Sequence, residues 1–239
     1  MTPRWTALAL CAALLAASSG CGKEPPAPGF AIRYEDPDRP DEDHAALLRS
    51  RRPVERAVEA LNAYLRLPAR VTVLARSCAG EGTGYDPDAR RIELCYDDLA
   101  EERALLGDDE AAADVTTETV HHEAGHALID LLGLPVASDR AEEDAADRFA
   151  AFMLIREGPR GERALRAAAE AYRLSPPADP GPDEHAPPAA RAAAHLCLLH
   201  GAAPDRHPDP APRPHACTPT WPTVRDTWTQ ALTPLLRHP

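Results

Sequence analysis

Aromatic side chains, positive charge and long apolar runs are all scarce in this chain of 239 residues. Aromatic residues make up only 5% of it, although 44% of its residues are hydrophobic. Because much of that hydrophobic share is alanine, we expect a thin, helix-rich core that few large side chains fill. The 26 basic residues are outnumbered by 38 acidic ones, and the net charge is -12. Such a chain repels phosphate backbones, which argues against nucleic acid as a partner.

An apolar run near the amino terminus is too short to span a bilayer. It covers residues 7–17, about half of the ~20 residues that a membrane-spanning helix needs. With Arg4 before it and small residues after it, the run predicts a signal peptide over residues 1–20. Residues 18–21, Ser-Ser-Gly-Cys, resemble a bacterial lipoprotein cleavage box with serine in place of its usual leucine. We therefore predict an exported protein of the cell envelope, held at the membrane by a lipid on Cys21; ordinary cleavage would release it as a secreted protein.

The remaining cysteines favour disulfides over a metal site. Outside the export signal there are four, an even number that is typical of exported proteins with disulfides. Of the three possible connectivities we favour Cys78 with Cys95 and Cys197 with Cys217, because each closes a loop of about twenty residues, worth ~3 kcal/mol. A cysteine-type zinc site would need closely spaced pairs, and these four residues form none.

Proline-rich stretches and apolar spacing divide the chain into a tether and one domain. Residues 21–43 are rich in Pro and Asp and predict a tether, in which only Phe30–Tyr34 is strand-prone. Residues 44–239 predict an α+β domain that is mainly helical, with a small sheet before its central motif. The expected strands are 71–74 and 91–96. The expected helices are 44–67 with a restart at Pro53, a helix from Thr116/Thr117 to Leu132, 140–157, 160–172, 189–200 and 223–236.

The segment 122–126, His-Glu-Ala-Gly-His, matches the H-E-x-x-H pattern in the middle of a predicted helix. Residues four apart project from one face of a helix, so His122 and His126 would bind one Zn²⁺ together. Glu123 would reach the water that the zinc binds. Two histidines and a water leave a tetrahedral site one protein ligand short, so the hypothesis requires a third.

Glu143 is the candidate third ligand. It lies on the next predicted helix, and an antiparallel return of the chain would bring it to the two histidines. Helix phase leaves three acidic neighbours as alternatives: Glu142, Asp144 and Asp139. Asp147, one turn after Glu143 on the same face, would accept the outer N–H of a zinc-bound histidine. That face is otherwise apolar, and two unpaired carboxylates in a core are costly unless a metal or a partner neutralises them.

These residues resemble the gluzincin zinc metallopeptidases, of which thermolysin is the familiar member. In that family H-E-x-x-H is followed by E-x-x-x-D on the next helix, as in residues 122–147 here. The chain is more similar still to an uncharacterised bacterial family classed with the metallopeptidases, over about residues 30–220, although only the metal motif is specific. The further matching segments are Leu67-Pro68, Cys78/Cys95, Asp183-Glu184-His185 and Leu196-Cys197; Pro187-Pro188 departs from the pattern.

The resemblance implies a metallopeptidase with one zinc ion per chain, held by His122, His126 and Glu143. Zinc would lower the pKa of its bound water towards ~7 and polarise the scissile carbonyl. Glu123 would take the water proton and give it to the leaving amine. His185 is the candidate cation that stabilises the oxyanion, and Asp147 would orient a ligand.

The substrate would be a protein or peptide outside the cytoplasm, and strand 91–96 would offer it a free edge. The alternative is a non-catalytic lipoprotein, a binding or scaffold module with a structural zinc site. A structural site needs no general base, so Glu123 favours the enzyme. His121 projects off the metal-binding face, so we expect it at the surface or in contact with a metal ligand, and not as a ligand itself. The tail histidines are expected at the surface, namely His195, His200, His207, His215 and His238, and the acidic runs 35–43 and 97–110 are expected to be solvated.

Overall fold

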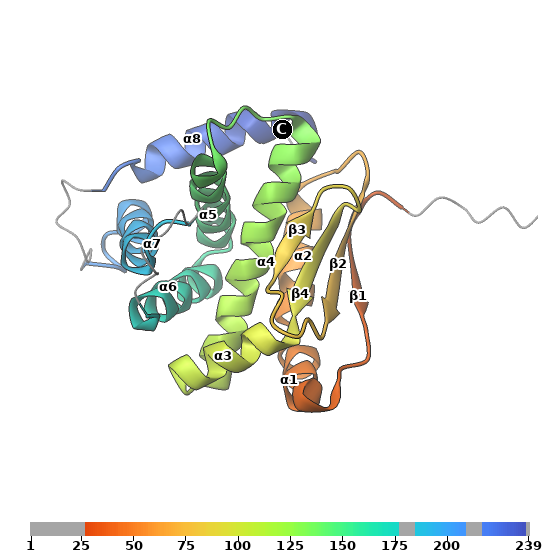
Figure 1. The fold of residues 1–239 in the computed structure, drawn as a ribbon. Helices are drawn as coiled ribbons and strands as arrows, with labels where there is room; N and C mark the ends of the chain where they lie inside the picture. Colours follow the sequence, from red (N-terminus) through yellow and green to blue (C-terminus); the bar gives the residue numbers. More distant parts are fainter. Residues whose placement is uncertain (1–26, 177–184, 209–216, 238–239) are drawn as a thin grey trace, which may run out of the picture.

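The computed structural model describes residues 27–176, 185–208 and 217–237 (Figure 1). The predicted signal peptide and Cys21 lie outside the described residues, as do His215 and His238. The fold is α+β, as the sequence predicts, with a small sheet that precedes most of the helices. In Figure 1 the sheet lies to one side of the long helix α4, and α5 to α8 lie to the other.

The sheet contains β1 (Gly29–Tyr34), β2 (Arg70–Arg76), β3 (Gly84–Asp86) and β4 (Arg91–Cys95), in the spatial order β1-β2-β4-β3. β1, β2 and β4 are parallel, and β3 is antiparallel to β4. The strand-prone residues of the predicted tether thus form β1. The prediction that strand 91–96 has a free edge is wrong, because β4 is hydrogen-bonded to β2 on one side and to β3 on the other. The edge strand beside it is β3, which the sequence analysis did not identify.

The helices of the described residues follow the predicted pattern with two differences. Their bounds are α1 (Glu42–Arg51), α2 (Pro53–Tyr64), α3 (Tyr96–Leu106), α4 (Asp109–Leu132), α5 (Asp139–Arg156), α6 (Pro159–Leu174), α7 (Pro188–Ala202) and α8 (Trp221–Leu232). The acidic run 97–110 is not only a solvated face, since it forms α3 and the start of α4, with Tyr96 and Leu99 buried. α4 begins earlier than predicted because the Asp108 side chain accepts hydrogen bonds from the backbone N–H groups of residues 110 and 111.

α4 is the central helix of the domain. It contacts the sheet through β3 and β4, and it also packs against α2, α3, α5 and α6. Because it is surrounded, small residues such as Ala124 and Ala127 are fully buried on it, beside Leu128. Gly133, with φ +58°, ends the helix in the left-handed conformation that glycine adopts at little cost. The chain then turns into α5, whose N-cap is Ser138.

Both predicted disulfides are present, Cys78–Cys95 and Cys197–Cys217. The first joins the end of β2 to the end of β4, and the second ties α7 to the segment before α8. Disulfides of this kind indicate an exported or extracellular protein. Within the part of the chain that the structure describes, no helix has the length and apolar character needed to cross a membrane.

Candidate metal centre

The two histidines of the motif point their Nε2 atoms at one another. His122 and His126 stand one turn apart on α4, and their Nε2 atoms are 3.2 Å apart. Glu143, on α5, completes the group: its Oε2 lies 3.1 Å from His122 Nε2, and its Oε1 lies 3.3 Å from His126 Nε2. The antiparallel return of α5 against α4 therefore brings Glu143 to both rings. The alternative acids do not occupy this position; Glu142 lies on the far side of His126.

These three side chains have the chemistry and spacing of a zinc site. Zinc–nitrogen bonds of about 2.0–2.1 Å in a tetrahedron place neighbouring ligand atoms ~3.3 Å apart, close to the separations found here. Glu143 Oε2 is buried, and its close contacts are the Nε2 atoms of His122 and His185, at 3.1 and 2.9 Å. A buried carboxylate oxygen that faces several imidazole nitrogens is a position that a cation fills well. The residues present thus fit the metal ion that the sequence implies.

Each histidine is oriented by a carboxylate on its other nitrogen. His122 Nδ1 lies 2.9 Å from Asp147 Oδ1, and His126 Nδ1 lies 2.9 Å from Glu142 Oε1. A proton on Nδ1 that is donated to a carboxylate leaves the Nε2 lone pair free for a metal. Asp147 therefore takes the place that the sequence predicts. Glu142 does not face the Nε2 atoms but contacts His126 at Nδ1, a position that its place next to Glu143 in the sequence did not reveal.

The histidines and carboxylates of the centre shift one another's pKa. Burial opposes ionisation of Glu143, but the neighbouring imidazoles of His122 and His126 hold its pKa well below its usual range. Burial would lower the pKa of His122, yet its contacts with Asp147 and Glu143 raise it to about 10. Asp147 is likewise held ionised, against burial, by its bonds to His122 and Arg191, which lower its pKa. The carboxylates thus carry negative charge beside the ring nitrogens, which suits a divalent cation.

Glu123 faces the same cleft from α4. Its side chain is nearly buried, and burial is the main cause of its raised pKa. The cleft has a volume of about 600 Å³, and β3 contributes Gly84 and Tyr85 to its lining. The Tyr85 hydroxyl donates to Asp130 at 2.9 Å, which ties the edge strand to the helix one turn beyond His126. The Glu123 carboxyl group, whose pKa is raised, therefore lies in an open cleft beside an edge strand.

His185 is brought to the centre as the sequence predicts. Its Nε2 lies 2.9 Å from Glu143 Oε2, and its ring stacks against His122 with 6.3 Å between ring centroids. The side chain is 37% exposed, so it is the most accessible of these groups. One atom each of His122, Glu143 and His185 lie within 4.8 Å of one another, which also allows His185 to approach a shared ion.

Three histidines that the sequence did not predict to be buried are buried in the structure. His195 was expected at the surface, but it is 1% exposed, and its Nε2 lies 3.1 Å from Glu118 Oε1. His207 is also buried and lies against Glu162. His121 is fully buried, with its Nδ1 2.8 Å from the Thr117 carbonyl oxygen, so it is not a surface residue either. His195 and His207 lie in alanine- and proline-rich segments, where local composition gives no sign of burial.

Arg191 is the other residue that the sequence analysis missed. Its guanidinium group holds Asp147, with Nε 2.9 Å from Oδ2 and one terminal nitrogen 2.5 Å from Oδ1. Arg191 and His195 are four residues apart on α7, so they project from one face of that helix. That spacing was the only feature of the sequence that could have linked the two residues, and it did not indicate which carboxylates they contact.

Comparison with known proteins gives one match, to a family model. The model of one protein family, DUF4344, described as "Putative metallopeptidase", matches residues 34–232. No curated protein and no solved structure matches the chain. The matched range includes the sheet from the end of β1, the paired histidines on α4, Glu143 on α5 and all of α8. The chain therefore belongs to the DUF4344 family of metallopeptidases, and a metal-dependent peptidase is the function that this membership indicates.

Proposed function

We propose that this protein is a zinc peptidase of the gluzincin type, which hydrolyses peptide bonds outside the cytoplasm. The observation that carries the proposal is the placement of Glu143 between the Nε2 atoms of His122 and His126, at 3.1 and 3.3 Å. Two imidazoles and one carboxylate are the ligands of a catalytic zinc site that keeps its fourth position open. The open cleft in front of them supports access by a substrate.

Each residue has a separate task in the proposed reaction. A bound zinc ion supplies a Lewis acid that lowers the pKa of a water molecule towards ~7 and polarises a carbonyl group. Glu123 takes the proton of the attacking water and transfers it to the leaving amine. Its pKa, raised by burial, suits a group that must first accept a proton and then release it. His185, at the accessible side of Glu143, donates to the developing oxyanion.

The substrate is proposed to bind as an extended strand along β3. β3 is an edge of the sheet, since it is paired only with β4 among the described strands, and it lines the cleft. Main-chain hydrogen bonds to such an edge hold a peptide without regard to its side chains. This replaces the edge that the sequence analysis assigned to strand 91–96.

The proposal extends to location. The disulfides support export, and the sequence of residues 1–21 supports anchoring by a lipid on Cys21.

A structural zinc site in a non-catalytic lipoprotein is the second candidate. His185 Nε2 lies close enough to Glu143 to take the fourth position, which would close the site. Glu123 and the cleft favour catalysis, because a closed structural site uses neither.

Metal analysis and hydrolysis of a peptide library test the proposal together. The wild-type protein should bind about one zinc per chain, and His126→Ala and Glu143→Ala should lose it with the fold retained. Glu142→Ala is the matched control: it removes a neighbouring carboxylate that is not a ligand, so zinc should be weakened and not lost.

Glu123→Gln separates the two candidates, because it should retain zinc and fold but lose hydrolysis. Hydrolysis by Glu123→Gln at the wild-type rate would refute the mechanism. Absence of zinc from wild-type protein that has been equilibrated with the metal would refute the site.

A further inference from the structure

A buried network of charged side chains lies behind the metal centre, away from the cleft. Asp147, which supports His122, is 8% exposed. Glu118, on α4 one turn before His122, is 1% exposed. Oxygen atoms of these two carboxylates and a nitrogen of His195 lie within 4.8 Å of one another. Two carboxylates this close in a core repel each other and lose hydration, so each needs its own partner.

α7 supplies both partners. Arg191 binds both oxygens of Asp147, and His195, one turn later, binds Glu118. The Arg191 guanidinium group also lies over the Tyr172 ring, 4.2 Å from its centroid, so it is held on two sides. Arginine carries a permanent charge and a rigid fork of donors, which fixes both the charge and the rotation of a carboxylate.

We propose that Arg191 is a positioning residue of the metal centre: it fixes the Asp147 carboxylate so that Oδ1 accepts the Nδ1 proton of His122. This inference rests on the proposed function, because His122 is taken there as a metal ligand. The bond from His122 to Asp147 holds the imidazole in the tautomer that leaves Nε2 free. Without the fork of Arg191, Asp147 would turn away from Glu118, and the His122 ring would lose its orientation.

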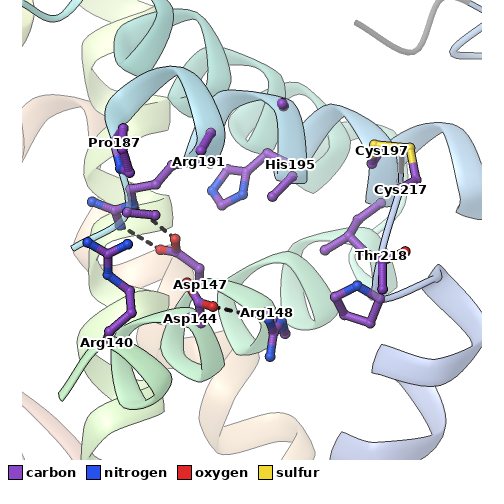
Figure 2. Close-up of a pocket in the computed structure, with 16 residues that line it drawn as sticks. Arg140, Asp144, Asp147, Arg148, Pro187, Arg191, His195, Cys197, Cys217 and Thr218 are labelled. Carbon is purple, nitrogen blue, oxygen red and sulfur yellow. Dashed lines mark hydrogen bonds and ion pairs between the residues drawn. A yellow bond between two sulfur atoms is a disulfide. The ribbon is translucent and has the colours of Figure 1, made fainter. Parts of the chain in front are cut away.

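The surroundings of Arg191 provide a matched control. Arg191 lines a cavity of about 480 Å³ that also includes Asp147, Arg148 and the second disulfide (Figure 2). Arg148 lies on α5 and pairs with Asp144 at 3.3 Å, where both side chains are 38% exposed. In Figure 2 this pair and the Arg191–Asp147 pair are separate. Removal of Arg148 therefore deletes an arginine from the same cavity without touching the support of His122.

The test measures zinc affinity by competition with a chromogenic chelator in wild-type protein and in Arg191→Ala, Arg191→Lys and Arg148→Ala. Arg191→Ala should weaken zinc binding by about 10–100-fold, and Arg148→Ala should leave it at the wild-type value. Arg191→Lys keeps the charge without the fork and should fall between them. Because Arg191 lines a cavity, millimolar methylguanidinium should restore affinity to Arg191→Ala and should not do so in Asp147→Asn. Wild-type affinity in a folded Arg191→Ala would overturn the proposal.

A measurement on metal-free protein keeps this proposal separate from the zinc function. Long-range ¹H–¹⁵N spectra of the histidine rings report whether His122 Nδ1 carries a proton that is protected from exchange. Wild type and Arg148→Ala should show a protected Nδ1 proton, which Arg191→Ala and Asp147→Asn should lose. If wild type binds no zinc but this pattern holds, the positioning role stands and the proposed function fails. If Arg191→Ala retains the protected proton, the positioning role is refuted whatever the zinc result.

Discussion

Gly125, the fourth residue of the H-E-x-x-H segment, sets how closely α4 and α5 approach. A Cβ atom built at Gly125 would lie 2.9 Å from the Ala146 Cα and 3.2 Å from its Cβ. Contact at 2.9 Å with backbone is too close, so Gly125→Ala would force the two helices apart by about half an ångström. Overpacking of this kind costs roughly 1–3 kcal/mol, and the better helix propensity of alanine returns about 1 kcal/mol. The net loss of stability should therefore be about 0–2 kcal/mol.

The effect on the metal centre should be much larger than the effect on stability. α4 carries both histidines and α5 carries Glu143, so any separation of the helices opens the group directly. Metal sites tolerate ligand displacements of only about 0.2 Å. We expect Gly125→Ala to weaken zinc binding by at least ~10-fold while the protein still unfolds cooperatively. Chelator competition and urea denaturation on the same sample measure the two quantities.

Gly84→Ala is the control for this experiment. Gly84 lies on β3, its φ is not positive, and an added Cβ there meets nothing within 4 Å. It should retain zinc affinity, with stability unchanged or slightly raised because the unfolded chain loses freedom. Zinc affinity in Gly125→Ala equal to that of wild type would show that the close approach of α4 and α5 does not set the geometry of the site.

Two further predictions concern the C-terminal part of the domain. Replacing Cys197 and Cys217 together by serine should lower the free energy of unfolding in urea by about 3 kcal/mol, because the loop of about twenty residues is no longer closed in the unfolded state; an unchanged midpoint would contradict this. The pKa of Glu162 is lowered, first by its hydrogen bond with Arg206 and against burial, with a further contribution from His207. Since its folded-state pKa lies below the unfolded value of ~4.3, this carboxylate stabilises the fold above that pH and loses its effect as the pH falls through the folded-state pKa. Urea midpoints of wild type and Glu162→Gln should therefore differ at neutral pH and converge in acid, and a constant difference would refute the assignment.

Local features of the sequence were sufficient for the helix that carries the motif. The four-residue spacing of His122 and His126 is a property of the helix itself, and Gly133 ends α4 where glycine is expected. The pairing of the cysteines followed from loop length, since the preferred partners are close in the chain. These features depend on neighbours within about twenty residues, which is why the sequence alone predicts them.

The sequence predicted the rotation of α5 about its axis only in part. Helix phase restricted the predicted third ligand to four acids, of which Glu143 was favoured. The rotation of α5 against α4 then directs Glu143 between the rings and Glu142 to the outer nitrogen of His126. That rotation depends on packing at contacts such as Gly125 on Ala146.

Long-range pairing accounts for the features near the site that the sequence did not predict. β3 has three residues and no apolar alternation, so it is a strand only because β4 pairs with it. Arg191 and His195 look like surface residues of an alanine-rich helix. Only the packing of α7 against α5 and α6 buries His195 and brings both side chains to carboxylates of other elements. The sequence alone therefore specified the chemistry of the motif, its helical spacing and its cross-links. The edge of the sheet, the choice among the acids and the charges behind the centre came from contacts between distant segments, which a local pattern does not encode.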